Sequence, residues 1–154
     1  MTRDESLLIA MPGEGQPFPG AGTIVCKVSS EATAGAFTVL ELKLEPNQGP
    51  PLHSHEFEDE FVYVESGACA VGTRTQEWVL TAGSCVVFPK QMPHFFRNDG
   101  EHSCTLLITA VPGGLDRYFA AVSSAVLREQ PEHIATINAQ YGIQFISQDQ
   151  AHNS

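Results

Sequence analysis

The chain has 154 residues, of which 42% are hydrophobic and 17% are charged, and these proportions suit one globular domain with an apolar core. Its 18 acidic and 8 basic side chains give a formal net charge of −10, so nucleic acids and anionic membrane surfaces are not expected as partners. No apolar run is long enough to cross a membrane, and Met1–Ala10 lacks the basic start and long apolar stretch of a secretory signal, so we expect a cytoplasmic location.

The N-terminal part of the chain predicts little regular structure. Met11–Gly20 is rich in glycine and proline, which interrupt helices and strands. We therefore expect residues 1–22 to form an irregular arm that lies over the rest of the domain or over a partner subunit.

Residues 23–112 consist of short β-type runs separated by turn residues. In one of these runs Leu40, Leu42 and Leu44 alternate with charged residues, which is the period of a half-buried strand. Many short strands without an intervening helix indicate a sandwich or a β-barrel. The expected strands are Thr23–Ser29, Phe37–Leu44, Leu52–His55, Glu60–Glu65, Ala68–Gly72, Glu77–Thr81, Ser84–Phe88, His94–Asn98 and Ser103–Ala110.

Residues 113–154 have a different pattern. Apolar residues recur near helical spacing over Leu115–Glu129, and a second helix is expected over Glu132–Gln140, directly after a proline. Gly142 stands where a glycine commonly ends a helix, and Ile143–Ile146 follows as a last strand. We expect these helices and the tail to pack on the barrel.

The four cysteines contain no Cys-x-x-Cys pair, so a zinc ribbon or a thioredoxin-like motif is not indicated. We expect free thiols that are buried as small apolar side chains. A disulfide is the alternative, but a reducing compartment disfavours it. The residues concerned are Cys26, Cys69, Cys85 and Cys104.

The segment from His53 to Glu60 carries the strongest chemical pattern of the sequence. Side chains alternate along a strand, so the imidazoles of His53 and His55 point to the same side and can converge on one point. The polar residues 56–59 indicate a turn, and Glu60 opens the following strand. The opposite register of that strand would bury Phe61 in place of Glu60, and the pattern leaves this choice open.

A third histidine stands at the start of another expected strand. His94, Phe96 and Asn98 share one face of that strand, and the apolar ring of Phe96 marks this face as the interior. His94 is therefore expected inside the barrel with the other two histidines.

Three imidazoles and one carboxylate make a site suited to one divalent metal ion. Two histidines and a carboxylate with open positions are typical of non-haem iron oxygenases, and Fe, Mn, Ni, Co, Cu and Zn all accept such ligands. The ligands carry one negative charge, so the loaded site keeps a net charge near +1, which favours an anionic substrate or the deprotonation of one. The alternatives are a chance His-x-His and a solvated acidic loop.

Both segments resemble the two conserved motifs of the cupin superfamily. The first reads His53-Ser-His55, four residues, Glu60, six residues, Gly67; Gly49 stands closer to His53 than the family's leading glycine does. The second reads Gly83, Pro89-Lys90-Gln91, His94, Asn98, with Gln91 in place of the family's glycine.

The resemblance implies an all-β fold, the double-stranded β-helix or jelly-roll barrel of the cupins, here followed by a short C-terminal helical segment. It also implies that His53, His55, Glu60 and His94 bind the metal. Glu58 and Asp59 are competing carboxylates, but only Glu60 stands six residues before Gly67. Over residues 20–147 the chain is similar to small single-domain cupins grouped with quercetin dioxygenases. Such proteins are commonly dimers, so a homodimer is expected.

The strand and helix patterns also supply candidate walls for a substrate pocket. Tyr118 and Phe119, on the first expected helix, can close the barrel mouth, and for every candidate the alternative is ordinary core packing. The candidates on strands are Leu42, Val62, Val64, Phe96, Leu106 and Ile108.

The resemblance implies a metal-dependent dioxygenase that acts on a flavonol-like or other enolisable aromatic or diketone small molecule. Glu60 would then be the catalytic proton acceptor as well as a ligand. One alternative is a non-oxidative enzyme on the same site, such as an isomerase, a cyclase or a decarboxylase. The other is a non-catalytic cupin that binds a small molecule.

Overall fold

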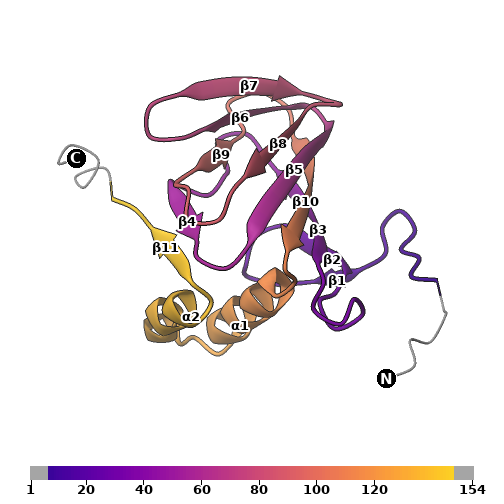
Figure 1. The fold of residues 1–154 in the computed structure, drawn as a ribbon, viewed down its shortest axis with the longest axis vertical. Helices are drawn as coiled ribbons and strands as arrows, with labels where there is room; N and C mark the ends of the chain where they lie inside the picture. Colours follow the sequence, from indigo (N-terminus) through magenta and orange to yellow (C-terminus); the bar gives the residue numbers. More distant parts are fainter. Residues whose placement is uncertain (1–6, 148–154) are drawn as a thin grey trace.

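Apolar residues at alternate positions build a six-stranded antiparallel sheet, which is the largest layer of the molecule (Figure 1). The computed structural model describes residues 7–147. Leu40, Leu42 and Leu44 are buried while their neighbours in the strand are not, as the alternation predicts. In spatial order the strands are β1 (Gln16–Pro17), β2 (Ile24–Val28), β3 (Thr38–Leu44), β10 (Cys104–Val111), β5 (Asp59–Ser66) and β8 (Cys85–Phe88).

Two smaller sheets form the opposite layer. One contains β7 (Glu77–Thr81), β6 (Ala68–Gly72) and β9 (Phe95–Arg97), and the other contains β11 (Ile143–Phe145) and β4 (His53–His55). An antiparallel bridge between His53 and His94 connects them. The apolar core lies between the two layers, and the expected all-β double-stranded β-helix is confirmed.

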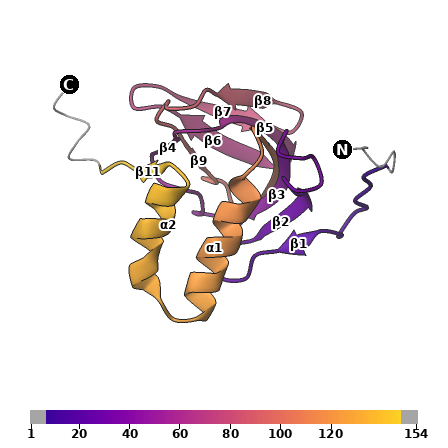
Figure 2. The ribbon, with the colours of Figure 1, turned by 60° about the horizontal axis from the view of Figure 1, so that its bottom comes forward.

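Two helices close one end of this barrel (Figures 1 and 2). They are α1 (Leu115–Leu127) and α2 (Ile134–Gln140), preceded by a short 3₁₀ turn, η1 (Pro131–His133). Helix α1 ends before the expected Glu129, whose φ of 56° is incompatible with a helix. Gly142, at φ 67°, follows α2 in the left-handed conformation expected of a C-terminal glycine.

The nine strands expected between Thr23 and Ala110 are present, and no end is shifted by more than one residue. The region expected to be irregular contains one additional short strand, β1, which pairs with β2 through Gln16 and Cys26. A strand of two residues is too short to show an alternating pattern in the sequence, so it could not be predicted. Residues 1–6 of the expected arm and 148–154 of the expected tail lie outside the described residues.

All four cysteines are free, and Cys26, Cys69 and Cys104 are buried as expected. The expected burial of Cys85 is wrong, because Cys85 lies on the outer face of β8, the edge strand of the large sheet, and is exposed. Among residues 7–147, no helix has the length and apolar character that crossing a bilayer requires.

Candidate metal centre

Strand β4 carries two of the four predicted ligands and is fixed on both of its edges. On one edge it pairs with β11, where Ile143 is opposite His55 and Phe145 is opposite His53. On the other edge the backbone N–H of His53 donates to the carbonyl oxygen of His94 at 2.9 Å, and the N–H of His94 donates back at 2.8 Å. Residues 41 positions apart in the chain are thereby held face to face.

Glu60 reaches the same point from the large sheet. Its strand, β5, lies between β10 and β8, where Glu60 is opposite Ala110 and Phe88. Glu60, Val62 and Val64 are buried while Phe61 is exposed, which decides the register that the sequence left open. The carboxylate therefore points into the barrel.

The four side chains converge on one small volume. Their candidate ligand atoms all lie within 4.8 Å of one another. His94 Nε2 is 2.9 Å and His55 Nε2 is 3.6 Å from Glu60 Oε2, and all four residues are buried. The cluster of His53, His55, Glu60 and His94 can hold one metal ion.

Backbone carbonyls fix the tautomers of two of these histidines. His53 Nδ1 lies 2.8 Å from the carbonyl oxygen of Pro51, and His94 Nδ1 lies 2.9 Å from that of Met92. A carbonyl oxygen only accepts hydrogen bonds, so each Nδ1 must carry a proton. In the neutral rings Nε2 is then unprotonated and directed into the cluster, as metal ligation requires.

Two observations test whether these residues fit a cation. Both ring nitrogens of His55 are buried without a hydrogen-bond partner, which is costly unless another group binds them. In addition, the lone pair of His94 Nε2 faces a carboxylate oxygen of Glu60 at 2.9 Å, so a proton or a cation must lie between them. The donor set therefore fits a divalent ion.

Burial and mutual charge shift the pKa values of the cluster. Burial and the neighbouring His94 lower the pKa of His53 to about 4, which keeps this ring neutral. Burial opposes ionisation of Glu60, but the His94 hydrogen bond and the three imidazoles outweigh it and lower the carboxyl pKa. Burial also opposes protonation of His55, but Glu58 and Glu60 outweigh it and raise its pKa.

Glu58 and Asp59, the two carboxylates that compete with Glu60 as ligands, lie outside the cluster. The exposed Asp59 accepts a hydrogen bond from the backbone N–H of Lys90 at 2.8 Å. Glu58 is buried, and its Oε2 approaches Nδ1 of His55 at 3.5 Å, on the side of that ring away from Glu60. The sequence did not single out this contact, because a residue in an acidic turn is usually solvated.

A cavity of about 310 Å³ opens onto the cluster, and His53, His55 and Glu60 form part of its wall. This volume falls at the lower end of the range for small-molecule sites. The rest of the wall is mainly apolar and includes Ile24 of β2, Leu40 of β3, Leu115 of α1 and Phe145 of β11.

The predicted pocket residues divide into two groups. Leu42, Phe96, Ile108, Tyr118 and Phe119 line the cavity. Val62, Val64 and Leu106 are fully buried in the core and are not part of the cavity wall. Alternation predicts that a side chain points inward, but neighbouring side chains decide whether it reaches the cavity or packs against other residues.

Two motif positions that depart from the family pattern have defined backbone roles. A Cβ on Gly49 would lie 2.1 Å from the carbonyl oxygen of Phe96, so only glycine fits there. Gln91 has a φ of 68°, the left-handed conformation that glycine adopts most easily, and its N–H donates to the carbonyl oxygen of His55. Gln91 thus makes a backbone hydrogen bond to β4, the strand that carries two of the ligands, although a glycine would adopt this conformation more easily.

Comparison with known proteins agrees with this fold and site. Residues 40–110 match the protein family described as the cupin domain. This span begins within β3 and ends within β10, so it contains all four residues of the cluster. The match covers the barrel strands from β3 to β10, and the double-stranded β-helix of the structure agrees with it.

Three relatives illustrate the similarity. Protein SchB of Streptomyces halstedii is 26% identical over 115 residues, which cover 73% of this chain and 82% of SchB. The solved structure of the polyketide cyclase RemF from Streptomyces resistomycificus aligns with a TM-score of 0.53 and 23% identity, over 62% of this chain and 68% of RemF. KdgF from Halomonas sp. aligns with a TM-score of 0.60 and 19% identity, over 73% of this chain and 99% of KdgF.

Proposed function

We propose that this protein is a metal-dependent dioxygenase that acts on a mainly apolar, enolisable small molecule, such as a flavonol-like aromatic or a diketone. One observation carries the proposal: the buried cluster of three histidines and a glutamate forms part of the wall of an otherwise apolar cavity. A substrate in that cavity has direct access to the ligand residues. This access also argues against a purely structural metal site.

Glu60 is the group that accepts the substrate's acidic proton. Its lowered pKa keeps the carboxylate ionised at neutral pH, and its position in the cavity wall places it beside a bound hydroxyl or enol. A bound divalent ion supplies Lewis acidity, which lowers the pKa of a hydroxyl group on the substrate.

The cavity wall favours a flat and largely apolar substrate. Phe96, Tyr118, Phe119 and Phe145 all contribute aromatic surface, against which rings pack favourably. Burial among these side chains also excludes water from the reacting atoms. A ligand of many hydroxyl groups would lose its hydration here without gaining enough partners.

The proposal is tested by loading the protein with Fe, Mn, Ni, Co, Cu or Zn and measuring oxygen uptake with flavonols, catechols and diketones. We expect uptake with at least one metal and one substrate, and a loss of about 10²–10⁴-fold in the Glu60→Gln variant. Asp59→Asn is the matched control, because this exposed neighbour lies outside the cluster. No oxygen uptake across the panel with metal-loaded protein would contradict a dioxygenase.

A non-oxidative reaction on the same substrate class is the second candidate. Proton removal by Glu60 next to an apolar wall also starts the cyclisation or isomerisation of an enolisable compound, and a decarboxylation would instead leave an enolate that a bound divalent ion would stabilise. RemF is a polyketide cyclase, so this fold is compatible with such chemistry. Product formation under strict anaerobiosis, without oxygen uptake, would favour this candidate over the first.

A further inference from the structure

The outer face of β4 and β11 forms the floor of an open groove of about 700 Å³. Side chains alternate along a strand, so Ser54, which stands between His53 and His55, points away from the metal cluster and into this groove. Gln144 is the partner of Ser54 in the β4–β11 pairing, so its side chain lies on the same outer face. Helix α2 and the turn at Gln91 form the sides of the groove.

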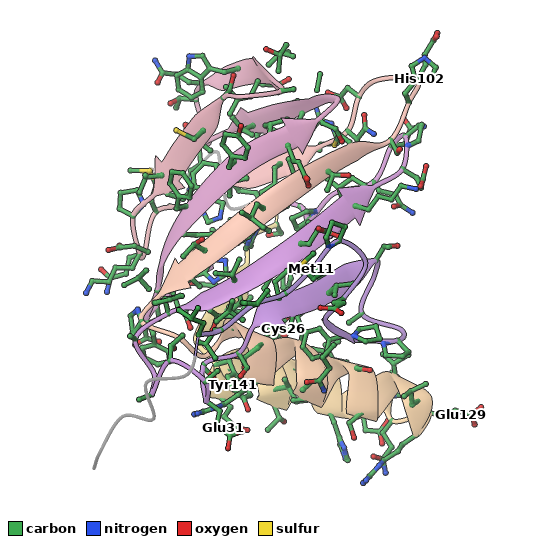
Figure 3. The ribbon with its side chains drawn as sticks, turned by 90° about the vertical axis from the view of Figure 1, so that its right-hand side faces the viewer. Met11, Cys26, Glu31, His102, Glu129 and Tyr141 are labelled. Carbon is green, nitrogen blue, oxygen red and sulfur yellow. The ribbon has the colours of Figure 1, made fainter. Side chains whose placement is uncertain are left out.

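The groove is distinct from the metal cavity and from the outer face of the large sheet. In Figure 1, β4, β11 and α2 lie together on the left of the barrel, and Figure 2 shows α2 beside β11. Figure 3 looks from the opposite side onto the large sheet, so β4 and β11 lie behind it. Ile143 and Phe145 contribute to the walls of both the groove and the metal cavity, so β11 separates these two spaces.

The polar side chains of the groove have hydrogen-bonding capacity that the described residues do not use. Ser54 is only 8% exposed, yet its hydroxyl has no hydrogen-bond partner among residues 7–147. The side-chain oxygen of Asn138 accepts from the Tyr118 hydroxyl at 2.9 Å, which leaves the two N–H donors of the same amide for a ligand. Buried polar groups normally have a partner, so this wall favours a ligand that is itself polar.

The groove combines donors with acceptors and has no cation in its wall. The amides of Gln91 and Gln144 and the hydroxyl of Ser54 can each donate and accept. Asn138 adds donors, and Glu56 adds an acceptor. A hydroxyl group also does both, so a ligand with several hydroxyls satisfies this set with one molecule. An anionic ligand would meet Glu56 with no Lys or Arg in the wall, in a chain of net charge −10.

We propose that this groove binds a neutral saccharide, with Ser54, Asn138 and Gln144 hydrogen-bonded to its hydroxyl groups. Ala135 and Ala139 of α2 supply small apolar surface for the C–H groups of a sugar ring. A volume of about 700 Å³ lies within the range of small-molecule sites. The metal cavity does not suit the same ligand, because its wall is mainly apolar. The saccharide site is therefore independent of the reaction proposed for the metal centre.

The experiment titrates the metal-free, ¹⁵N-labelled full chain with glucose, galactose, mannose and maltose and follows the backbone amide resonances by NMR. We expect saturable shifts with at least one of these sugars, centred on β4, β11 and α2. Ala139→Trp places a large ring in the groove and should abolish the shifts. Ala82→Trp is the matched control, because Ala82 is exposed in the turn between β7 and β8, outside the groove, and this variant should bind like the wild type.

Single hydrogen-bond variants test the assigned contacts. Ser54→Ala and Gln144→Ala should each weaken binding by about 2–10-fold, the range for one hydrogen bond between neutral groups. Gln76→Ala, exposed between β6 and β7, should leave the affinity unchanged. The NMR spectrum of each variant shows whether it is folded.

Three results would overturn the saccharide site. The first is the absence of saturable shifts with all four sugars, and the second is a set of shifts that persists in Ala139→Trp or centres on the metal cavity. The third is glucuronate, the anionic counterpart of glucose, binding as tightly as the neutral sugars. Because the protein is free of metal and no turnover is measured, each of these results leaves the proposal for the metal centre to its own test.

Discussion

His55 differs from the other two histidines of the cluster in the group that lies beside its Nδ1 atom. Backbone carbonyls of Pro51 and Met92 fix the rings of His53 and His94, whereas the buried carboxylate of Glu58 lies 3.5 Å from Nδ1 of His55. A carboxylate in this position orients a histidine ligand and increases its basicity. The two groups form no hydrogen bond at this distance, and we predict that Glu58 positions His55 when a metal ion binds Nε2 and Nδ1 carries a proton.

Replacing Glu58 with Gln should weaken divalent metal binding by about 10–100-fold, the usual effect of losing such a contact. Gln has the same shape but no charge, so the barrel should remain folded. Titration against a coloured chelator measures the affinity, and Asp59→Asn is the matched control for charge. Equal affinities of the wild type and Glu58→Gln would refute the role assigned to Glu58.

The lowered pKa of His53 makes the metal-free protein sensitive to acid. The unfolded chain takes up this proton near pH 6.5 and the folded chain only near pH 4, so stability is fully present above pH 6.5 and is lost as the pH falls to about 4. The loss amounts to about 3 kcal/mol from this group. Urea unfolding of metal-free protein at pH 7 and pH 4.5 measures it, and His53→Gln should make the dependence shallower.

The sequence was sufficient to predict all four residues of the cluster, although Glu60 was selected by the resemblance to the family motif, because strand alternation left its register open. The sequence was not sufficient to predict which neighbouring groups lie beside these four side chains and orient them. The carbonyls of Pro51 and Met92 have no side-chain signal, and Glu58 looks like any residue of an acidic turn. Such partners depend on the path of the backbone, which residue types do not encode locally.

At the level of elements, α1 is joined to the large sheet by a buried polar network around Asp116. One carboxylate oxygen accepts from the backbone N–H and the hydroxyl of Ser30, both at 3.0 Å, and the other accepts from the Thr38 hydroxyl at 3.1 Å. Since Leu115 and Tyr118 of the same helix contribute to the cavity wall, this network also positions that wall.

Asp116→Ala should lower the free energy of unfolding by about 3 kcal/mol, because it leaves buried donors on Ser30 and Thr38 without an acceptor. Guanidinium unfolding measures the change. Arg117→Ala, at the exposed neighbouring position of α1, should change stability by at most about 0.5 kcal/mol. Similar values for the two variants would show that the network contributes little.

The sequence could not predict which strands far apart in the chain pair with each other. A last strand was expected after α2, but the pattern of Ile143–Ile146 does not tell that this strand pairs with β4 and brings Phe145 to the cavity. Partner choice between strands far apart in sequence is set by the whole barrel. The same reason explains why Val62, Val64 and Leu106 were expected in the pocket and instead pack in the core.

At the scale of the whole molecule, the candidate site ties the two layers of the barrel together. His53 and His55 come from β4, in the layer of the small sheets, and His94 is bridged to His53 just before β9, whereas Glu60 comes from β5 in the large sheet. An ion bound by all four residues would cross-link the layers. Unfolding would separate the ligands, so binding and folding stability are coupled.

A divalent ion at a concentration of about 100 times its Kd should therefore raise the free energy of unfolding by about 2.7 kcal/mol. Thermal unfolding with and without the ion measures the gain, and a chelator should remove it. His94→Gln, which keeps the backbone bridge to His53, should abolish most of the gain while leaving the metal-free protein folded. The stabilisation should also fade as the pH falls through the raised pKa of His55, because a proton then competes with the ion for this imidazole. A melting temperature that does not respond to any divalent ion would mean that the two layers are held by apolar packing alone.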